Sequence, residues 1–188
     1  MYEATLASAA PECLAPAHDH ARLRKTFVEH YAGVWRFLRR MGVPAHCADD
    51  AAQQVFLIAL EALPRIVAGS ERAYVYSTAV RIAHGVRRRR EREIGGMDVD
   101  SAGSALSGPD ELTDQKRARQ VLDRLLERME IDMRTAFVLV EIDGFTVPEV
   151  AKVLAIPVGT AASRLRRARE QFHALVRTHV DTSPRSKG

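Results

Sequence analysis

The sequence predicts an all-α protein of two small helical domains, joined by a flexible linker, with a helix-turn-helix in the C-terminal domain. Apolar residues recur every three or four positions in most segments, which is the period of an amphipathic helix. No stretch of useful length alternates apolar and polar residues as a strand would. The segment 93–110 is rich in glycine, serine and aspartate and has no sustained period, so we expect it to be the linker.

The first domain is expected to span residues 21–92, after a tail at 1–20 that we expect to be disordered. An apolar stripe from Leu23 to Leu38 predicts its first helix, which ends before Gly42.

Two further helices complete this domain. The apolar pattern predicts one helix over about 46–63, which Pro64 ends because proline cannot continue a helix. A short loop, 64–70, then leads to a helix over about 71–92.

The second domain is expected over 111–178, followed by a tail at 179–188. A 3–4 spaced pattern predicts its first helix from Leu112 to Met129. The next segment, 131–143, is apolar on nearly every side, so this helix should be central.

The segment 144–169 predicts two short helices joined by a tight turn. Thr146 is a good N-cap, and Glu149 is placed to complete a capping box. Phe145 and Val150 occupy the two positions of a hydrophobic staple at the same helix start. Pro157 separates this helix from the next and suits a first helical turn.

The second of these helices has one apolar face and one face of hydroxyl and guanidinium groups. Thr160, Ser163, Arg164 and Arg167 share the polar face. A DNA-binding helix-turn-helix needs this division, because one edge must be buried and the other must enter a groove. The alternative is an ordinary helical hairpin with a solvated basic face.

Basic residues gather in two separate places in a chain of net charge +4 and isoelectric point near 9.4. One cluster lies at 87–92 and the other at 164–169. Two separated basic stripes suit a long anionic backbone, because each neutralised phosphate releases counterions. A single such run would more simply be a solvated helix end.

Two further surfaces carry possible binding chemistry. The helix at 46–63 has a polar face opposite its apolar stripe, suited to docking on another protein, although most such faces are only solvated. Around the loop 64–70, arginines alternate with Tyr74 and Tyr76, and rings with cations can hold unstacked bases. The alternative for these tyrosines is that at least one of them caps the helical core.

Several classes of function are not supported by the sequence. Cys13 and Cys47 are too few for a disulfide framework, and Cys13, His18 and His20 lack a fourth metal ligand nearby. No signal peptide or transmembrane stretch is visible, so we expect a cytoplasmic protein without membrane insertion. No nucleophile–base pair or phosphate-binding loop is present, so we expect no enzyme and no cofactor.

Three strings resemble one known family: DDAAQQVFLIAL (49–60), RAYVYSTAVRIAHGVRRRR (72–90) and GFTVPEVAKVLAIPVGTAASRLRRAR (144–169). Together they look like a bacterial RNA polymerase sigma factor of the sigma-70 family. The type is the small extracytoplasmic-function (ECF) class, which has only the second and fourth sigma regions. The resemblance covers about 21–178, and its helix-turn-helix string is close to diagnostic.

The resemblance implies a promoter-specificity factor that binds core RNA polymerase, recognises the −35 and −10 promoter elements and assists promoter melting. Its implied partners are the clamp helices and flap of the large polymerase subunits, promoter DNA and an anti-sigma factor. The implied polymerase-binding residues are Asp50, Gln53, Gln54, Leu57 and Glu61. The implied −10 residues are Arg65, Ser70, Arg72, Tyr74, Tyr76, Arg81, His84 and Arg88. The implied −35 residues are Thr160, Ser163, Arg164, Arg166 and Arg167.

The chain departs from the usual family pattern at several positions. Gln54 stands where glutamate is common, and Tyr74 where tryptophan is usual. Arg81 and Gly85 replace a frequent asparagine and aspartate, which leaves the downstream base preference open. Ala161 and Ala162 replace a typical valine–lysine pair, which removes one expected contact of the recognition helix, and Pro148 replaces an acidic residue.

A rival hypothesis is a stand-alone helix-turn-helix repressor or activator. Such a protein would bind duplex DNA tightly without polymerase and would dimerise on a palindrome.

Overall fold

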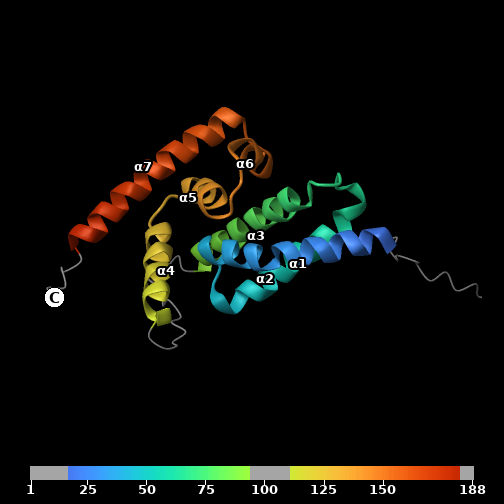
Figure 1. Cartoon of the computed structure of the whole chain (residues 1–188), viewed down its shortest axis with the longest axis horizontal. Helices are drawn as coiled ribbons and strands as arrows, with labels where there is room; N and C mark the ends of the chain where they lie inside the picture. The colour runs from blue at the N-terminus through green and yellow to red at the C-terminus, as the bar shows by residue number, and fades with distance from the viewer. Residues whose placement is uncertain (1–16, 94–110, 183–188) are drawn as a thin grey trace, which may run out of the picture.

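The structure, a computed structural model, describes residues 17–93 and 111–182, and all the regular elements in these two ranges are helices (Figure 1). The expectation of an all-α fold is therefore confirmed. The residues of the expected linker lie outside the described ranges, as do most residues of the two expected tails.

The first half of the chain is a three-helix unit. It contains α1 (Ala17–Arg40), α2 (Ala45–Ala62) and α3 (Glu71–Glu93), which pack against one another. Its core is fully buried and includes Val34 and Phe37 of α1, Val55 of α2 and Val75 of α3. A short 3₁₀ turn, η1 (Leu63–Arg65), ends α2 at the proline, as the sequence predicts.

The second half contains α4 (Glu111–Glu127), α5 (Ile131–Phe137), η2 (Val138–Ile142), α6 (Val147–Leu154) and α7 (Val158–Thr182). The segment expected as one central helix is thus divided, because η2 is a π-helical turn. The Asp143 N–H donates to the Val138 carbonyl, five residues back, at 2.9 Å. Ala136, Val138 and Leu139 are nevertheless fully buried, as expected of a central element.

Local signals at the helix-turn-helix fold as predicted. The Thr146 side chain accepts from the Glu149 N–H, and the Glu149 carboxylate accepts from the Thr146 N–H at 2.7 Å, so the capping box is complete. Phe145 and Val150 are both buried at the start of α6. The helix ends at Leu154, and its C-cap Ala155, whose φ of 52° lies in the left-handed region, stands just before Ile156 and Pro157.

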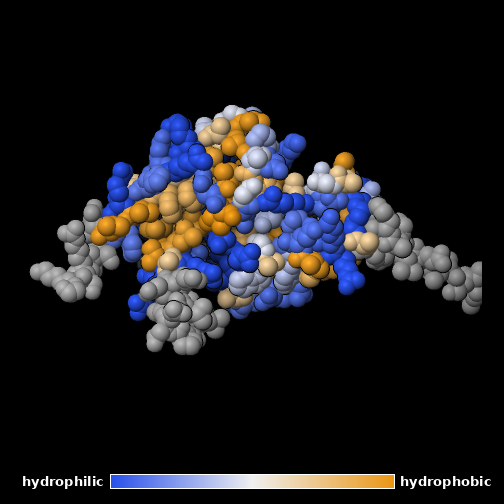
Figure 2. All heavy atoms as spheres, viewed as in Figure 1, coloured by the Kyte–Doolittle hydropathy of each residue, from blue (hydrophilic) through white to orange (hydrophobic). Residues whose placement is uncertain are grey.

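The outer helices extend further than the sequence analysis predicts. Helix α1 begins at Ala17, inside the expected N-terminal tail, because no helix breaker lies between Pro16 and the apolar stripe. Helix α7 continues to Thr182, inside the expected C-terminal tail, because no glycine or proline lies between Gly159 and Pro184. Figure 2 shows hydrophobic residues gathered over the C-terminal part of α7, where Val180 is 64% exposed.

The two halves pack against each other through one continuous core. Helix α3 contacts α6, and α1 contacts α4 (Figure 1). Thr135 of α5 approaches the Met41 sulfur at 3.5 Å, and the buried Arg134 guanidinium lies 3.5 Å from the Arg40 carbonyl. The structure is therefore a closed arrangement of both halves.

Candidate nucleic-acid and polymerase interface

The polar face of α2 is fully available to solvent. Its five predicted docking residues, Asp50, Gln53, Gln54, Leu57 and Glu61, are all exposed, and the Leu57 side chain is 60% exposed. An exposed leucine between amides and carboxylates is suited to an interface with an apolar centre and a polar rim.

Helix α1 carries two exposed apolar residues that the sequence analysis assigned to the core or did not single out. Phe27 is 42% exposed and Val28 is 73% exposed. The Phe27 ring lies 4.7 Å from Tyr31 and 5.0 Å from Phe56 of α2, measured between ring centroids. Phe27 stands near the outer end of its apolar stripe, and this position is the one sequence signal that could have indicated its exposure.

The loop between η1 and α3 is anchored at its base and exposed at its tip. Arg22 of α1 donates to the Glu71 carboxylate at 2.6 Å and to the Ile66 carbonyl at 3.0 Å. The Glu71 carboxylate also accepts from the Gly69 N–H at 2.7 Å. Arg65 and Ser70 are exposed, as is Val67 at 75%. Arg22 and Glu71 hold this loop in place, and the sequence analysis identified neither.

Helix α3 divides the predicted strand-binding residues into exposed and enclosed groups. Arg81 and Arg88 are exposed, and Arg81 donates to the Thr78 hydroxyl of its own helix at 2.9 Å. Tyr74 and His84 are half-buried. Burial lowers the pKa of His84 and favours the neutral imidazole, although Asp132 opposes this effect.

Tyr76 is a core residue in this structure, so its assignment to base stacking does not fit the observed placement. Its side chain is 4% exposed and packs edge-on between Phe37 at 5.5 Å and Phe145 at 4.8 Å. The alternative that at least one tyrosine caps the core is therefore the one that applies to Tyr76. Ala79, Val80 and Ala83 share its helix face and could have indicated this burial, whereas its contact with Phe145 of the other half could not be read from the local pattern.

The side chain of Arg72 also contacts the second half of the chain. Its guanidinium lies 3.9 Å from the centroid of the Phe145 ring and donates to the Asp143 carbonyl. This cation–π contact and hydrogen bond place Arg72 between the two halves instead of on an outer face of α3.

The polar face of α7, the candidate recognition helix, contains both exposed and half-buried residues. Ser163, Arg166 and Arg167 are exposed, whereas Thr160 and Arg164 are half-buried. Arg164 pairs with Asp132 of α5 at 2.8 Å, and Arg166 pairs with Glu170 at 2.8 Å. The buried residues Ala161, Leu165 and Ala168 fix the opposite face, as the apolar pattern predicts.

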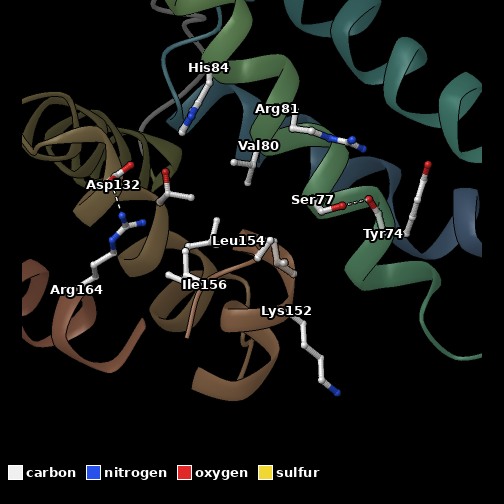
Figure 3. Close-up of a pocket in the computed structure, with 13 residues that line it drawn as sticks. Tyr74, Ser77, Val80, Arg81, His84, Asp132, Lys152, Leu154, Ile156 and Arg164 are labelled. Atoms are coloured by element: carbon white, nitrogen blue, oxygen red, sulfur yellow. Dashed lines mark hydrogen bonds and ion pairs between the residues drawn. The ribbon is translucent and has the colours of Figure 1, made fainter. Parts of the chain in front are cut away.

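A cavity of about 540 Å³ lies between α3 and the second half. Figure 3 shows Arg164 directed toward Asp132, and Lys152 directed away from the cavity. The Nε2 atom of His84 is buried without a hydrogen-bond partner. The polar residues that line the cavity from the two sides are Tyr74, Ser77, Arg81, His84, Asp132, Thr135, Lys152 and Arg164.

The described residues contain no group of three or more metal-ligating side chains. Cys13 and the side chains of His18 and His20 lie outside the part of the chain whose side chains are described. Among the described helices, none is both long and apolar enough to cross a bilayer.

Two family models match the chain, and together they cover both halves. The model of Sigma-70 region 2 matches residues 26–93, which include α2 and α3. The model of Sigma-70 region 4 matches residues 119–172, which include the helix-turn-helix.

The chain is similar to the ECF RNA polymerase sigma-E factor of Escherichia coli K12, with 33% identity over 68% of this chain and 73% of that protein. It is also similar to the ECF RNA polymerase sigma factor SigE of Mycolicibacterium smegmatis, with 24% identity over 84% of this chain and 63% of that protein.

Among solved structures, the fold matches the sigma factor RpoE of Bartonella quintana, crystallised with the anti-sigma factor NepR. That match has a TM-score of 0.68 at 21% identity and covers 83% of this chain and 97% of the other. CnrH in complex with the cytosolic domain of CnrY matches with a TM-score of 0.63 at 21% identity, over 85% of this chain and 90% of that one.

Proposed function

Since this chain belongs to the sigma-70 family, in its ECF class, and is a promoter-specific transcription initiation factor, we propose that α2 binds core RNA polymerase while α3 and α7 bind the two promoter elements. The observation that carries this division is the exposure of all five predicted docking residues on α2, on a different helix from the exposed recognition edge of α7. Each surface is therefore free to bind its own partner.

The docking surface on α2 has the composition of a protein interface. Leu57 supplies an exposed apolar centre, and Asp50, Gln53, Gln54 and Glu61 surround it with hydrogen-bonding groups. Phe27 of α1, which packs on Phe56 of α2, is a further exposed apolar side chain of this half. We assign this surface to the polymerase clamp helices, as the family resemblance implies.

The −10 element is assigned to the anchored loop and to α3. Arg65, Ser70, Arg81 and Arg88 are exposed and can contact phosphates of a displaced strand. Tyr74 is the remaining aromatic candidate for stacking on a base, because Tyr76 is enclosed by Phe37 and Phe145.

The −35 element is assigned to α7, whose N-terminal turns would lie in the major groove. Ser163 and Arg167 are exposed on its polar face and can contact phosphate or base edges. Arg164 shares this face but is held by Asp132, so it would have to exchange that carboxylate for DNA.

An anti-sigma factor is the proposed inhibitory partner. Among proteins of similar fold, RpoE of Bartonella quintana was crystallised with the anti-sigma factor NepR, and CnrH has been solved in complex with the cytosolic domain of CnrY.

Run-off transcription with purified core polymerase tests the assignment of the recognition helix. The template is selected from a randomised duplex library by the reconstituted holoenzyme. Arg167→Ala should reduce specific output about 5- to 150-fold, because a good arginine–guanine contact provides about 1–3 kcal/mol. Arg177→Ala removes the same charge further along α7 and should leave output within about twofold. Equal output from both variants would refute the groove assignment.

A gel shift with the same template distinguishes a sigma factor from a stand-alone helix-turn-helix regulator. A stand-alone regulator would bind this duplex equally well with and without polymerase in a gel shift. A sigma factor should give a specific complex only in the presence of core enzyme.

A further inference from the structure

The loop between η1 and α3 is held by a hydrogen-bonded bridge from α1. The N-terminal part of α1 lies at the same end of the three-helix unit as this loop (Figure 1). The Arg22 guanidinium donates to the Glu71 Oε1 atom, from Nε at 3.1 Å and from Nη2 at 2.6 Å. Its Nη2 atom also donates to the Ile66 carbonyl at 3.0 Å, and the Glu71 Oε2 atom accepts from the Gly69 N–H at 2.7 Å. We call Arg22 and Glu71 the loop bridge.

The loop bridge is enclosed, whereas the segment that it holds is open to solvent. The Arg22 and Glu71 side chains are 19% and 16% exposed. Residues 67–70 are exposed, and the exposed fraction of Val67 reaches 75%. A DNA base that meets this loop therefore contacts its tip and not the bridge. Arg22 and Glu71 influence such a base through the conformation of the loop and through their charges.

The charges of the two bridge residues offset each other. Burial alone would raise the pKa of the Glu71 carboxyl, but the hydrogen bonds from Arg22 and Gly69 and the positive charge of Arg22 hold this pKa below its ordinary value. Glu71 is therefore ionised at neutral pH. An unpaired carboxylate in this loop would repel DNA phosphates, and Arg22 at 2.6 Å removes most of that repulsion. The bridge thus gives the loop a fixed geometry and adds little net charge.

The loop contains a tight turn that the bridge completes. The Ser70 N–H donates to the Val67 carbonyl at 2.9 Å, and Gly69 has a φ of 88°, in the left-handed region. A loop that is ordered before DNA arrives does not lose its conformational entropy at the moment of binding. A fixed loop also discriminates better between bases, because a mobile loop can adapt its shape to several of them.

We propose that the loop bridge sets the base selectivity of the −10 contact by fixing segment 66–70 before DNA binds. Arg22 and Glu71 are positioning residues, because they act on the base through the loop tip. Loss of the bridge should relax the choice of base at the −10 positions that the loop contacts and leave the −35 positions unaffected. This proposal rests on the proposed function, which assigns the loop to the −10 element.

Run-off transcription on templates that differ by one base measures this selectivity. The templates derive from the duplex selected by the reconstituted holoenzyme, with each −10 and −35 position changed in turn to the other three bases. Discrimination at a position is the output with the selected base divided by the mean output with the other three. Arg22→Ala should lower discrimination at least about fivefold at the −10 positions that the loop contacts, because the loop loses hydrogen bonds from a charged group. Discrimination at the −35 positions should stay within about twofold of wild type.

Gly69→Ala identifies independently the positions that the loop contacts. An alanine Cβ would meet no atom within 4 Å, but a φ of 88° strains an L-residue that has a side chain. The substitution should therefore relax discrimination at the same −10 positions as Arg22→Ala. Since both changes act through one loop, the double variant should lose no more than about a further twofold. Effects at different positions, or losses that multiply, would overturn the proposal.

Arg24→Ala is the matched control, because Arg24 is an exposed arginine of the same helix. It removes an equal charge and should leave discrimination at every position within about twofold of wild type. Unchanged −10 discrimination in Arg22→Ala would overturn the proposal, and so would a uniform loss at all positions, which a merely structural role predicts. If the wild-type holoenzyme shows no base discrimination at any −10 position, the proposed function fails instead.

A conservative variant and an exchanged pair test the geometry of the bridge without removing all charge. Arg22→Lys replaces a planar fork by a single ammonium group and should lower −10 discrimination at least about twofold, with an unchanged thermal midpoint. Arg22→Glu combined with Glu71→Arg restores an ion pair. The new arginine cannot accept from the Gly69 N–H, however, and the new glutamate cannot donate to the Ile66 carbonyl. The exchanged pair should therefore not restore discrimination, and wild-type discrimination in either variant would overturn the proposal.

Discussion

Replacing Asp143 with asparagine should make the folded chain more stable at neutral pH, although it removes a carboxylate that lies near three arginines. Burial raises the pKa of the Asp143 carboxyl to about 6, against the opposing effects of Arg40, Arg36, Arg72 and the hydrogen bond from Tyr76. Its Oδ2 atom is buried without a hydrogen-bond partner. The folded chain therefore favours the neutral carboxyl group, which asparagine imitates.

The sign and size of the effect follow from proton linkage. The Asp143 pKa is raised from 3.8 to about 6, so between these values the folded state binds more protons than the unfolded state. Stability is therefore greatest below pH 3.8 and is lost as pH rises toward 6. The full shift corresponds to about 3 kcal/mol, and solvent screening of a partly exposed group reduces this to about 2 kcal/mol.

Urea unfolding of both proteins between pH 4 and pH 8 measures this effect. The difference in unfolding free energy, Asp143→Asn minus wild type, should grow through this window and level off above pH 6. Glu141→Gln is the matched control, because Glu141 is an exposed carboxylate two residues from Asp143 and pairs with Arg169. A difference that is independent of pH, or equal for both variants, would refute the reasoning.

The remaining predictions concern the helix-turn-helix and the docking surface. Thr146→Ala removes one side of the capping box and should lower the free energy of unfolding by about 1 kcal/mol in urea titrations, whereas an unchanged midpoint would contradict the role of this cap. Asp50→Ala combined with Gln53→Ala should weaken co-elution with core polymerase while leaving the thermal midpoint unchanged, because both side chains are exposed. Undiminished co-elution would argue against α2 as the docking surface.

Features that depend on neighbours in the sequence were predictable. The capping box, the staple of Phe145 and Val150 and the buried face of α7 all rest on spacings of a few residues, and the structure contains each of them. The exposed face of α2 follows from the same helical period.

Features that depend on distant segments were not predictable. The partner of Arg72 is 71 residues away, and Tyr76 is buried by Phe145 of the other half. The helical period does separate Tyr76 from Tyr74, because Ala79, Val80 and Ala83 follow Tyr76 at helical spacing, but it does not identify Phe145 as the ring that covers Tyr76. The pairing of Arg164 with Asp132 likewise joins two helices that no spacing rule connects.

The π-helical turn η2 has a consequence for how this domain can change over evolutionary time. Each residue of an α-helix advances the chain by about 100°, and a π turn accommodates one surplus residue without breaking the helix. Deleting a single codon within 138–142 would restore the regular α-helical hydrogen bonds. The segment after the deletion would then be rotated about the helix axis by roughly a quarter turn. The direction from which Phe145 contacts Tyr76 and Arg72 therefore depends on one extra residue in this turn. Insertions and deletions at this point would alter the mutual orientation of the halves more than most point substitutions could.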